Sequence, residues 1–296
     1  YNDELTPDVT SYDYDAVLTE EGRVTEKYRL FQAEIATRVG PTTLMTTEYI
    51  PRMAYGEAKE VASAPLMTLA EQLPAVQSLV PRSMERLGQS YGYTLYRTTL
   101  TNEAELTSIR LVDANDRAHV LLDGHIIATL YDRELLTAYT FAQPVPVRSG
   151  ARLEILVENM GRVNYSFMLE RQRKGIDGCV VLNGHQHYGW EMVALDEAAL
   201  CSLQMEGQSA VAGAPSVRRL SFRVEQRGDT FLVLPGWGKA TVFLNGFCLG
   251  RMWEIGPQKR LYVPGPMLRQ GENELLIVET EGHTGKALLL DEPDLG

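Results

Sequence analysis

Apolar residues recur at helical spacing near the start of the chain. The stripe consists of Val24, Tyr28, Phe31 and Ile35. Intervals of three and four residues place these side chains on one face of a helix, and Gly40 followed by Pro41 is a typical helix end. The sequence therefore predicts a helix over 23–39. One amphipathic helix cannot bury its own stripe, and no other helical pattern in this chain is large enough to cover it.

From Gly88 onwards the pattern changes to short alternating runs, which are typical of strands that bury one face. One such run ends at Asp123-Gly124 and another at Asn245-Gly246. These dipeptides favour hairpin turns, because both of their residues tolerate positive φ. The sequence therefore predicts a mainly β protein.

Two passages of the β-rich region resemble each other. RAHVLLDG at 117–124 matches KATVFLNG at 239–246, and GARLEILVEN at 150–159 matches GENELLIVET at 271–280, at almost the same offset. Chance does not easily reproduce a hairpin and the strand after it. We therefore expect two related β-sandwich domains of jelly-roll or galactose-binding-like type.

The chain is expected to divide into five parts. They are an N-terminal segment with the helix at 1–40, a Pro-rich connector at 41–87, a first β-sandwich domain at 88–170, a linker at 171–215 and a second β-sandwich domain at 216–296. A strand near 55–63 of the connector could join either β-domain. A short helix could start at Asp196.

Length and charge narrow the class of protein. With 296 residues the chain has room for about two domains at roughly 150 residues each. A net charge of −11 argues against nucleic-acid binding, which needs an excess of Lys and Arg. No apolar run reaches the roughly 18 residues of a membrane span, and no leader segment opens the chain. We expect no nucleic-acid or membrane partner and a cytoplasmic location. Because the chain begins with Tyr1 and not Met, we also expect it to start inside a longer product.

Signals for metal or cofactor chemistry are weak. The three cysteines are sparse and form no CxxC pair, so we interpret them as reduced thiols. His185 and His187 form an HxH pair, but no second pair joins them to complete a zinc site, and we interpret them as part of an exposed loop. No nucleophile elbow or Gly-rich phosphate loop is present. We expect no metal and no organic cofactor.

Three aromatic residues are candidates for sugar binding. Trp237 lies between two glycines, where it could present its ring as a carbohydrate platform or could close over the end of the sandwich. Tyr12 and Tyr14 flank Asp13, so on an extended segment both rings share one face and could bind sugar hydroxyls. A structural turn is the alternative for this acidic-aromatic stretch.

Several long motifs resemble glycoside hydrolase family 35, the β-galactosidases. TSYDYDAVLTEEGRVTEKY at 10–28 resembles the segment that closes the catalytic (β/α)8 barrel of that family, and GQSYGYTLYRT at 88–98 resembles the entry to its first β-domain. GRVNYS at 161–166 is similar to a family loop that usually ends in Gly. The stretch at 231–268 resembles the C-terminal domain of the family almost throughout.

This resemblance implies roles for particular residues. The helix at 23–39 would be the last helix of the barrel, and the two glutamates of a retaining double displacement would lie upstream, so no catalytic residue is expected in this chain. Tyr14 would line the galactose pocket, with Tyr12 and Asp13 in support. We expect Tyr165, in the similar loop, at the mouth of the pocket.

Three functions remain open at this stage. The chain could be the non-catalytic C-terminal part of a β-galactosidase, whose partners would be the upstream barrel, a β-galactoside oligosaccharide bound by the intact enzyme, and a second copy of the chain in a homodimer. It could be a stand-alone carbohydrate-binding module with Trp237 as its platform. It could also be an assembly domain without a ligand.

Overall fold

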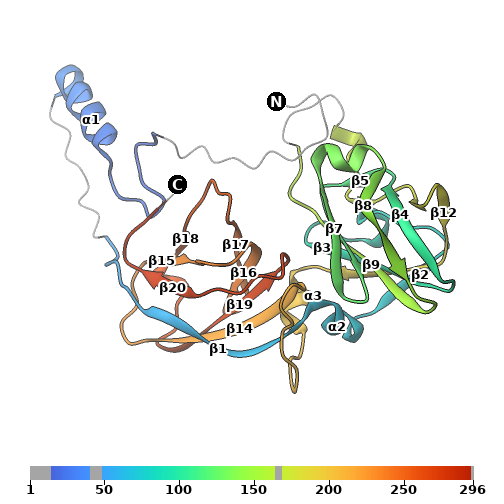
Figure 1. The fold of residues 1–296 in the computed structure, drawn as a ribbon. Helices are drawn as coiled ribbons and strands as arrows, with labels where there is room; N and C mark the ends of the chain where they lie inside the picture. The colour runs from blue at the N-terminus through green and yellow to red at the C-terminus, as the bar shows by residue number, and fades with distance from the viewer. Residues whose placement is uncertain (1–14, 41–48, 164–168, 295–296) are drawn as a thin grey trace. The chain divides into compact units, whose positions relative to one another are not determined.

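A computed structural model describes residues 15–40, 49–163 and 169–294. The chain divides into two compact units (Figure 1). The first contains Ala64–Ala214, and the second combines Thr10–Ser63 with Pro215–Gly296. Each unit has its own hydrophobic core, so the expectation of two β-domains is confirmed.

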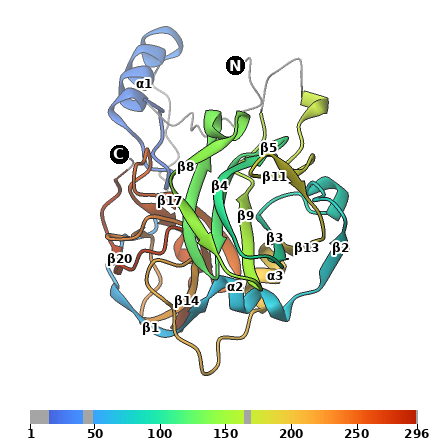
Figure 2. The same cartoon turned by 45° about the vertical axis from the view of Figure 1, so that its right-hand side comes forward.

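The first unit is a sandwich of two antiparallel sheets. The six-stranded sheet has the order β2 (Ala75–Ser78), β13 (Trp190–Leu195), β3 (Tyr93–Leu100), β9 (Ala151–Glu158), β6 (Arg117–Leu122), β7 (His125–Tyr131). The four-stranded sheet has the order β12 (His185–His187), β11 (Val180–Leu182), β4 (Ala104–Leu111), β8 (Tyr139–Val147). Figure 2 shows β4 and β8 of the smaller sheet beside β9, β3 and β13 of the larger one. A separate pair joins β5 (Ala114–Asn115) to β10 (Gly175–Ile176).

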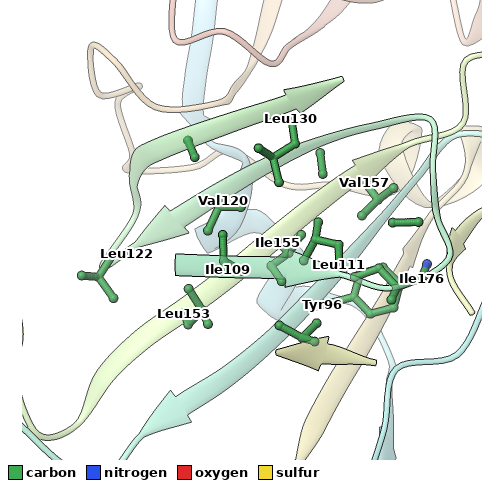
Figure 3. Close-up of a cluster of buried hydrophobic side chains, with 14 of the residues drawn as sticks. Tyr96, Ile109, Leu111, Val120, Leu122, Leu130, Leu153, Ile155, Val157 and Ile176 are labelled. Carbon is green, nitrogen blue, oxygen red and sulfur yellow. The ribbon is translucent and has the colours of Figure 1, made fainter. Parts of the chain in front are cut away.

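The core of this unit lies between the two sheets. Figure 3 shows Ile109 and Leu111 of β4 together with side chains of the larger sheet, such as Val120 and Ile155. These core positions alternate along their strands with residues of the opposite face, as a sandwich requires. Short helical elements complete the unit: α2 (Leu66–Leu69), η1 (Ala70–Gln72), η2 (Glu85–Leu87), η3 (Asp132–Leu136), η4 (Leu169–Arg171) and α3 (Glu197–Ser202). The expected helix after Asp196 is α3, and the Asp196 carboxylate accepts a hydrogen bond from the N–H of Ala199.

The second unit contains one strand from the connector and seven from the C-terminal region. Its order is β17 (Phe247–Trp253), β16 (Lys239–Leu244), β19 (Gly271–Glu279), β14 (Ser216–Val224), β1 (Gly56–Pro65), β20 (Ala287–Leu290), β15 (Thr230–Val233), β18 (Leu261–Val263). A short η5 (Gly265–Met267) precedes β19. Val242 of β16 and Val263 of β18 share one core although they stand far apart in this order. The strands therefore curl round into a sandwich.

The two repeated hairpins have the same structure. β6 pairs with both β7 and β9, and β16 pairs with both β17 and β19. Asp123 and Asn245 have φ of 49° and 51°, as primed hairpin turns need. Both hairpins also have a register shift at the equivalent place, after Val120 and after Val242. The internal repeat seen in the sequence is thus confirmed by the pairing.

The stretch 171–215, expected to be a linker, contains the strands β10, β11, β12 and β13. β11 pairs with β4, and β13 pairs with β2 and β3, so this stretch supplies strands to both sheets of the first sandwich. Two of its strands, β11 and β12, have only three residues each. Such short strands show no alternation, and their membership comes from pairing with distant residues. The connector is also divided, because β1 joins the second unit and β2 the first.

The helix α1 (Glu26–Val39) has no buried residue. It begins at Glu26, three residues later than expected, because Thr25 is its N-cap and accepts a hydrogen bond from the N–H of Tyr28 at 3.4 Å. Its apolar side chains are open to solvent, with Phe31 52% and Ile35 53% exposed. Among the described residues, no helix combines the length and apolar character that a membrane span requires.

Candidate functional site

Three of the predicted sugar-binding residues, Tyr12, Tyr14 and Tyr165, lie outside the described residues. The chain is described from Asp15 onwards after Tyr14, and on both sides of the segment that contains Tyr165. It forms a turn-rich segment from Asp15 to Thr25 in the second unit, and two limbs at 159–163 and 169–174 in the first unit. Trp237 is the fourth candidate and is described in full.

Trp237 does not present its ring as a sugar platform. The side chain is 2% exposed and belongs to the core of the second unit. Its indole N–H donates to the backbone oxygen of Lys286 at 2.9 Å, and the guanidinium of Arg218 lies 5.7 Å from the ring centroid. A sugar stacks on an open ring face, so this candidate is corrected: Trp237 closes the end of the sandwich.

A buried carboxylate holds the neighbouring loop in place. Glu279 is 0% exposed, and its carboxylate accepts hydrogen bonds from the backbone N–H groups of Glu281, Gly282 and His283 at 2.7–3.0 Å. Burial raises the pKa of Glu279, and these three donors oppose that rise. This end of the second sandwich is therefore held by packing and backbone hydrogen bonds.

Asp116 and Lys174 form a buried ion pair in the first unit. Lys174 Nζ lies 2.6 Å from Asp116 Oδ1, and the two side chains are 0% and 2% exposed. The second oxygen of Asp116 accepts from the backbone N–H of Met160 at 2.8 Å. Burial raises the pKa of Asp116 and lowers the pKa of Lys174. One carboxylate thus contacts both limbs of the segment that contains Tyr165.

Glu85 makes a second connection between the same limbs. It accepts from the backbone N–H of Lys174 at 3.1 Å and pairs with Arg162 at 2.8 Å. Burial alone would raise the pKa of Glu85, but the hydrogen bonds to its carboxylate, including that from Arg162, outweigh burial and lower it. The amide oxygen of Gln172 also accepts from the N–H of Val163, at 3.3 Å. We call Asp116, Lys174, Glu85, Arg162 and Gln172 the limb clamp.

No local pattern in the sequence predicts the limb clamp. Asp116 and Lys174 stand far apart in the chain, and each has ordinary polar neighbours in the sequence. Asp116 comes directly before β6, and Lys174 directly before β10. Their juxtaposition therefore results from the pairing of β5 with β10.

The HxH pair lies on a strand, and not in the exposed loop that was expected. His185 and His187 are the ends of β12, and the side chain of His187 packs edge-on against Trp190, with ring centroids 5.6 Å apart. His187 Nε2 lies 3.1 Å from Thr98 Oγ1, and burial lowers the pKa of this histidine. Among the described residues, no three His, Cys, Asp or Glu side chains are grouped so that they could hold a metal ion. The three cysteines form no disulfide.

The start of the described chain is a small hairpin in the second unit. Leu18 and Val24 form a β-bridge, and the Thr25 hydroxyl donates to the backbone oxygen of Val17 at 2.9 Å. Lys27 Nζ donates to the backbone oxygen of Asp15 at 2.7 Å and to its carboxylate at 3.0 Å. The residue that directly follows Tyr14 in the chain is therefore held by the first turn of α1.

Comparisons with known proteins agree with this architecture. The family model described as "Beta-galactosidase, first all-beta domain" matches residues 81–196, and the one described as "Beta-galactosidase, galactose-binding domain" matches residues 215–273. The first match covers most of the first sandwich, including β11, β12 and β13. The second match begins at the start of β14.

Curated relatives align with almost the whole chain. "Beta-galactosidase-1-like protein 2" of Homo sapiens is 36% identical over 98% of this chain and 46% of its own length. "Beta-galactosidase" of Mus musculus is 33% identical over 95% of this chain and 47% of its own length. "Beta-galactosidase" of Xanthomonas manihotis is 34% identical over 88% of this chain and 43% of its own length.

The chain thus spans about half the length of the curated relatives it matches. The two family models match successive parts of the chain, the first all-beta domain before the galactose-binding domain. The resemblance to glycoside hydrolase family 35 is confirmed, and the chain belongs to the β-galactosidase family, of which it contains non-catalytic β-domains.

Proposed function

We propose that this chain is the C-terminal part of a β-galactosidase that removes terminal β-linked galactosyl residues with retention of configuration. In this proposal both catalytic glutamates belong to an upstream barrel. The chain supports that barrel and forms part of the rim of the substrate cleft. Relatives of about twice its length are consistent with a missing catalytic half.

The observation that carries the proposal is the open apolar face of α1. Leu30, Phe31, Ile35 and Val39 are 52–70% exposed, and none of the helix is buried. Burying one such side chain contributes about 1.5–3 kcal/mol, and a helix of this length owes most of its stability to packing. The last helix of a (β/α)8 barrel would bury this face against the barrel.

The proposed sugar-binding residues are Tyr14, supported by Tyr12, and Tyr165. Two observations support them: Lys27 contacts Asp15, the residue that follows Tyr14, and the limb clamp joins the two limbs that flank the segment with Tyr165. Residues that contact a substrate need such support, because small displacements of a binding group weaken binding.

Hydrolysis of an aryl β-D-galactoside tests the proposal. The full-length protein is expected to release the aryl group, whereas the 296-residue chain alone is expected to be inactive. Replacing the two barrel glutamates by glutamine in the full-length protein is the matched control for contaminating enzyme. Release of galactose by the purified chain alone, at enzymatic rates, would refute the proposal.

The stand-alone binding module makes a different prediction. Titration of the chain with galactose or lactose would show millimolar or tighter binding that Trp237→Ala abolishes. Because Trp237 is buried, we do not expect this binding. The expected homodimer and the cytoplasmic location stay predictions, and the mass of the protein in solution measures the first of them.

A further inference from the structure

The hairpin that follows Tyr14 has a defined shape of its own. Besides the bridge between Leu18 and Val24, the backbone N–H of Thr19 donates to the oxygen of Arg23 at 2.8 Å. The N–H of Gly22 donates in turn to the oxygen of Thr19 at 2.8 Å. These bonds fix the internal shape of the hairpin, and its placement depends on its contacts with the rest of the second unit.

Glu21, at the tip of the hairpin, makes a strong contact of this kind. Its side chain is 1% exposed, and its carboxylate oxygens Oε1 and Oε2 accept from Nε of Arg52 at 3.0 and 3.1 Å. Nη2 of Arg52 also donates to Oε1. Arg23 adds a contact to the same carboxylate at 3.0 Å. Bidentate pairs between Arg and a carboxylate fix direction as well as distance. We call Glu21 and Arg52 the hairpin tether.

Arg52 is held against the sheet of the second unit. It forms a parallel bridge with Asp229, whose backbone oxygen accepts from the N–H of Met53 and whose N–H donates to the oxygen of Pro51, each at 2.8 Å. The Arg52 guanidinium also lies 5.8 Å from the ring centroid of Phe231, a buried residue of β15. The tether thus connects the hairpin to a core strand.

Apolar packing beside the tether is sparse. A hollow of about 470 Å³ separates part of the hairpin from the sandwich, and Leu18, Phe231 and Pro293 are among its lining residues. Because this space is open, the hairpin is not held there by close packing. The bidentate ion pair therefore restrains its orientation, together with hydrogen bonds from Arg23 to the backbone oxygen of Ile50 at 2.9 Å and from Gln258 to Glu20 at 3.5 Å.

We propose that Glu21 and Arg52 are positioning residues for galactose binding: the second β-domain, through this tether, holds the segment that continues from Tyr14. The inference rests on the proposed function, because it takes Tyr14 as a residue of the galactose pocket. It adds that galactose affinity depends on an ion pair of the second unit, to which the connector contributes Arg52.

The experiment compares three variants of the full-length protein. Arg52→Met removes the guanidinium and keeps the aliphatic stem, and Arg52→Lys keeps the charge without the bidentate geometry. Arg223→Met is the control, because the pair of Arg223 with Glu272 lies on the same unit at 3.5 Å and is 70% and 63% exposed. The readouts are kcat and KM for an aryl β-D-galactoside, the inhibition constant of galactose, and amide hydrogen exchange of residues 16–25.

Arg52→Met is expected to raise KM and the galactose inhibition constant by the same factor, about tenfold, with kcat nearly unchanged. This is the pattern expected when a contribution to binding is lost equally from the ground state and the transition state. Exchange of the hairpin amides should accelerate. Arg52→Lys should lie between Arg52→Met and wild type, and Arg223→Met should resemble wild type. A purely structural defect would instead lower the active fraction, and with it the apparent kcat, without changing the inhibition constant.

Two results would overturn the inference separately from the proposed function. If the wild type hydrolyses galactosides and Arg52→Met leaves KM and the inhibition constant unchanged, the positioning role is wrong. If the hairpin amides of Arg52→Met exchange as slowly as those of the wild type, the tether itself is wrong, whatever the activity. A wild type without galactosidase activity refutes the proposed function, and the link to galactose with it.

Discussion

Replacing Lys174 by methionine is expected to destabilise the first unit strongly. The substitution removes the cation of a fully buried ion pair and leaves Asp116 in the same apolar surroundings. Breaking such a pair from one side costs about 3–5 kcal/mol. Asp116 keeps its hydrogen bond from Met160 N–H, and burial has already raised its pKa, so it can take up a proton more easily. We therefore expect a loss of about 3 kcal/mol, the lower end of that range.

The change in stability caused by a second substitution distinguishes an unpaired buried charge from a simple loss of packing. Asp116→Asn removes the orphaned charge and still offers an oxygen to the N–H of Met160. The double variant Asp116→Asn, Lys174→Met is therefore expected to be more stable than Lys174→Met alone, by about 1–2 kcal/mol, because neighbours in one network are not additive. Burial raises the pKa of Asp116 and lowers the pKa of Lys174, because it disfavours the charged form of both residues. Removing the charge that is left unpaired should therefore recover stability.

Differential scanning calorimetry of the chain measures both effects. A loss of about 3 kcal/mol corresponds to a fall in Tm of about 6–12 °C for a domain of this size. The transition of the second unit should not change, because the limb clamp lies in the first unit. Arg86→Met is the control, since Arg86 lies in the first unit, is 67% exposed and pairs with Asp177 at the surface. A double variant less stable than Lys174→Met, or a Lys174→Met variant as stable as wild type, would refute the argument.

Three further predictions concern other parts of the molecule. Trp237→Ala is expected to destabilise the second unit by about 3–5 kcal/mol in denaturant unfolding, as the removal of a large core side chain does; a loss below 1 kcal/mol would contradict its burial. The folded-state pKa of Glu85 lies below its unfolded value of about 4.3, so its contribution to stability is present above that pH and is lost as the pH falls through the folded value. Unfolding of Glu85→Gln should therefore depend less on pH between about 5 and 3 than unfolding of the wild type. Replacing Phe31 and Ile35 by serine should leave the unfolding of this chain unchanged but lower the yield of folded, active full-length protein; equal yields would count against a barrel partner for α1.

Local patterns in the sequence were sufficient wherever the structure is local. Thr25 caps α1 and Gly40 ends it with positive φ, and both signals depend on residues within one turn of each other. The turns at Asp123-Gly124 and Asn245-Gly246 follow from dipeptides that tolerate positive φ. The long alternating strands on either side repeat in both halves, so the sequence alone predicts two related β-domains.

What the sequence by itself determined is therefore the kind of protein: mainly β, built from a repeated hairpin, with one amphipathic helix whose apolar side chains are exposed among the described residues. Tertiary structure decided which strands belong together, including β11 and β12, which are too short to show a period. It also decided that Trp237 is buried and that Asp116 meets Lys174. The physical reason is the same in each case: burial and ion pairing depend on residues brought together from distant parts of the chain, whereas caps and turns depend on neighbours in the sequence.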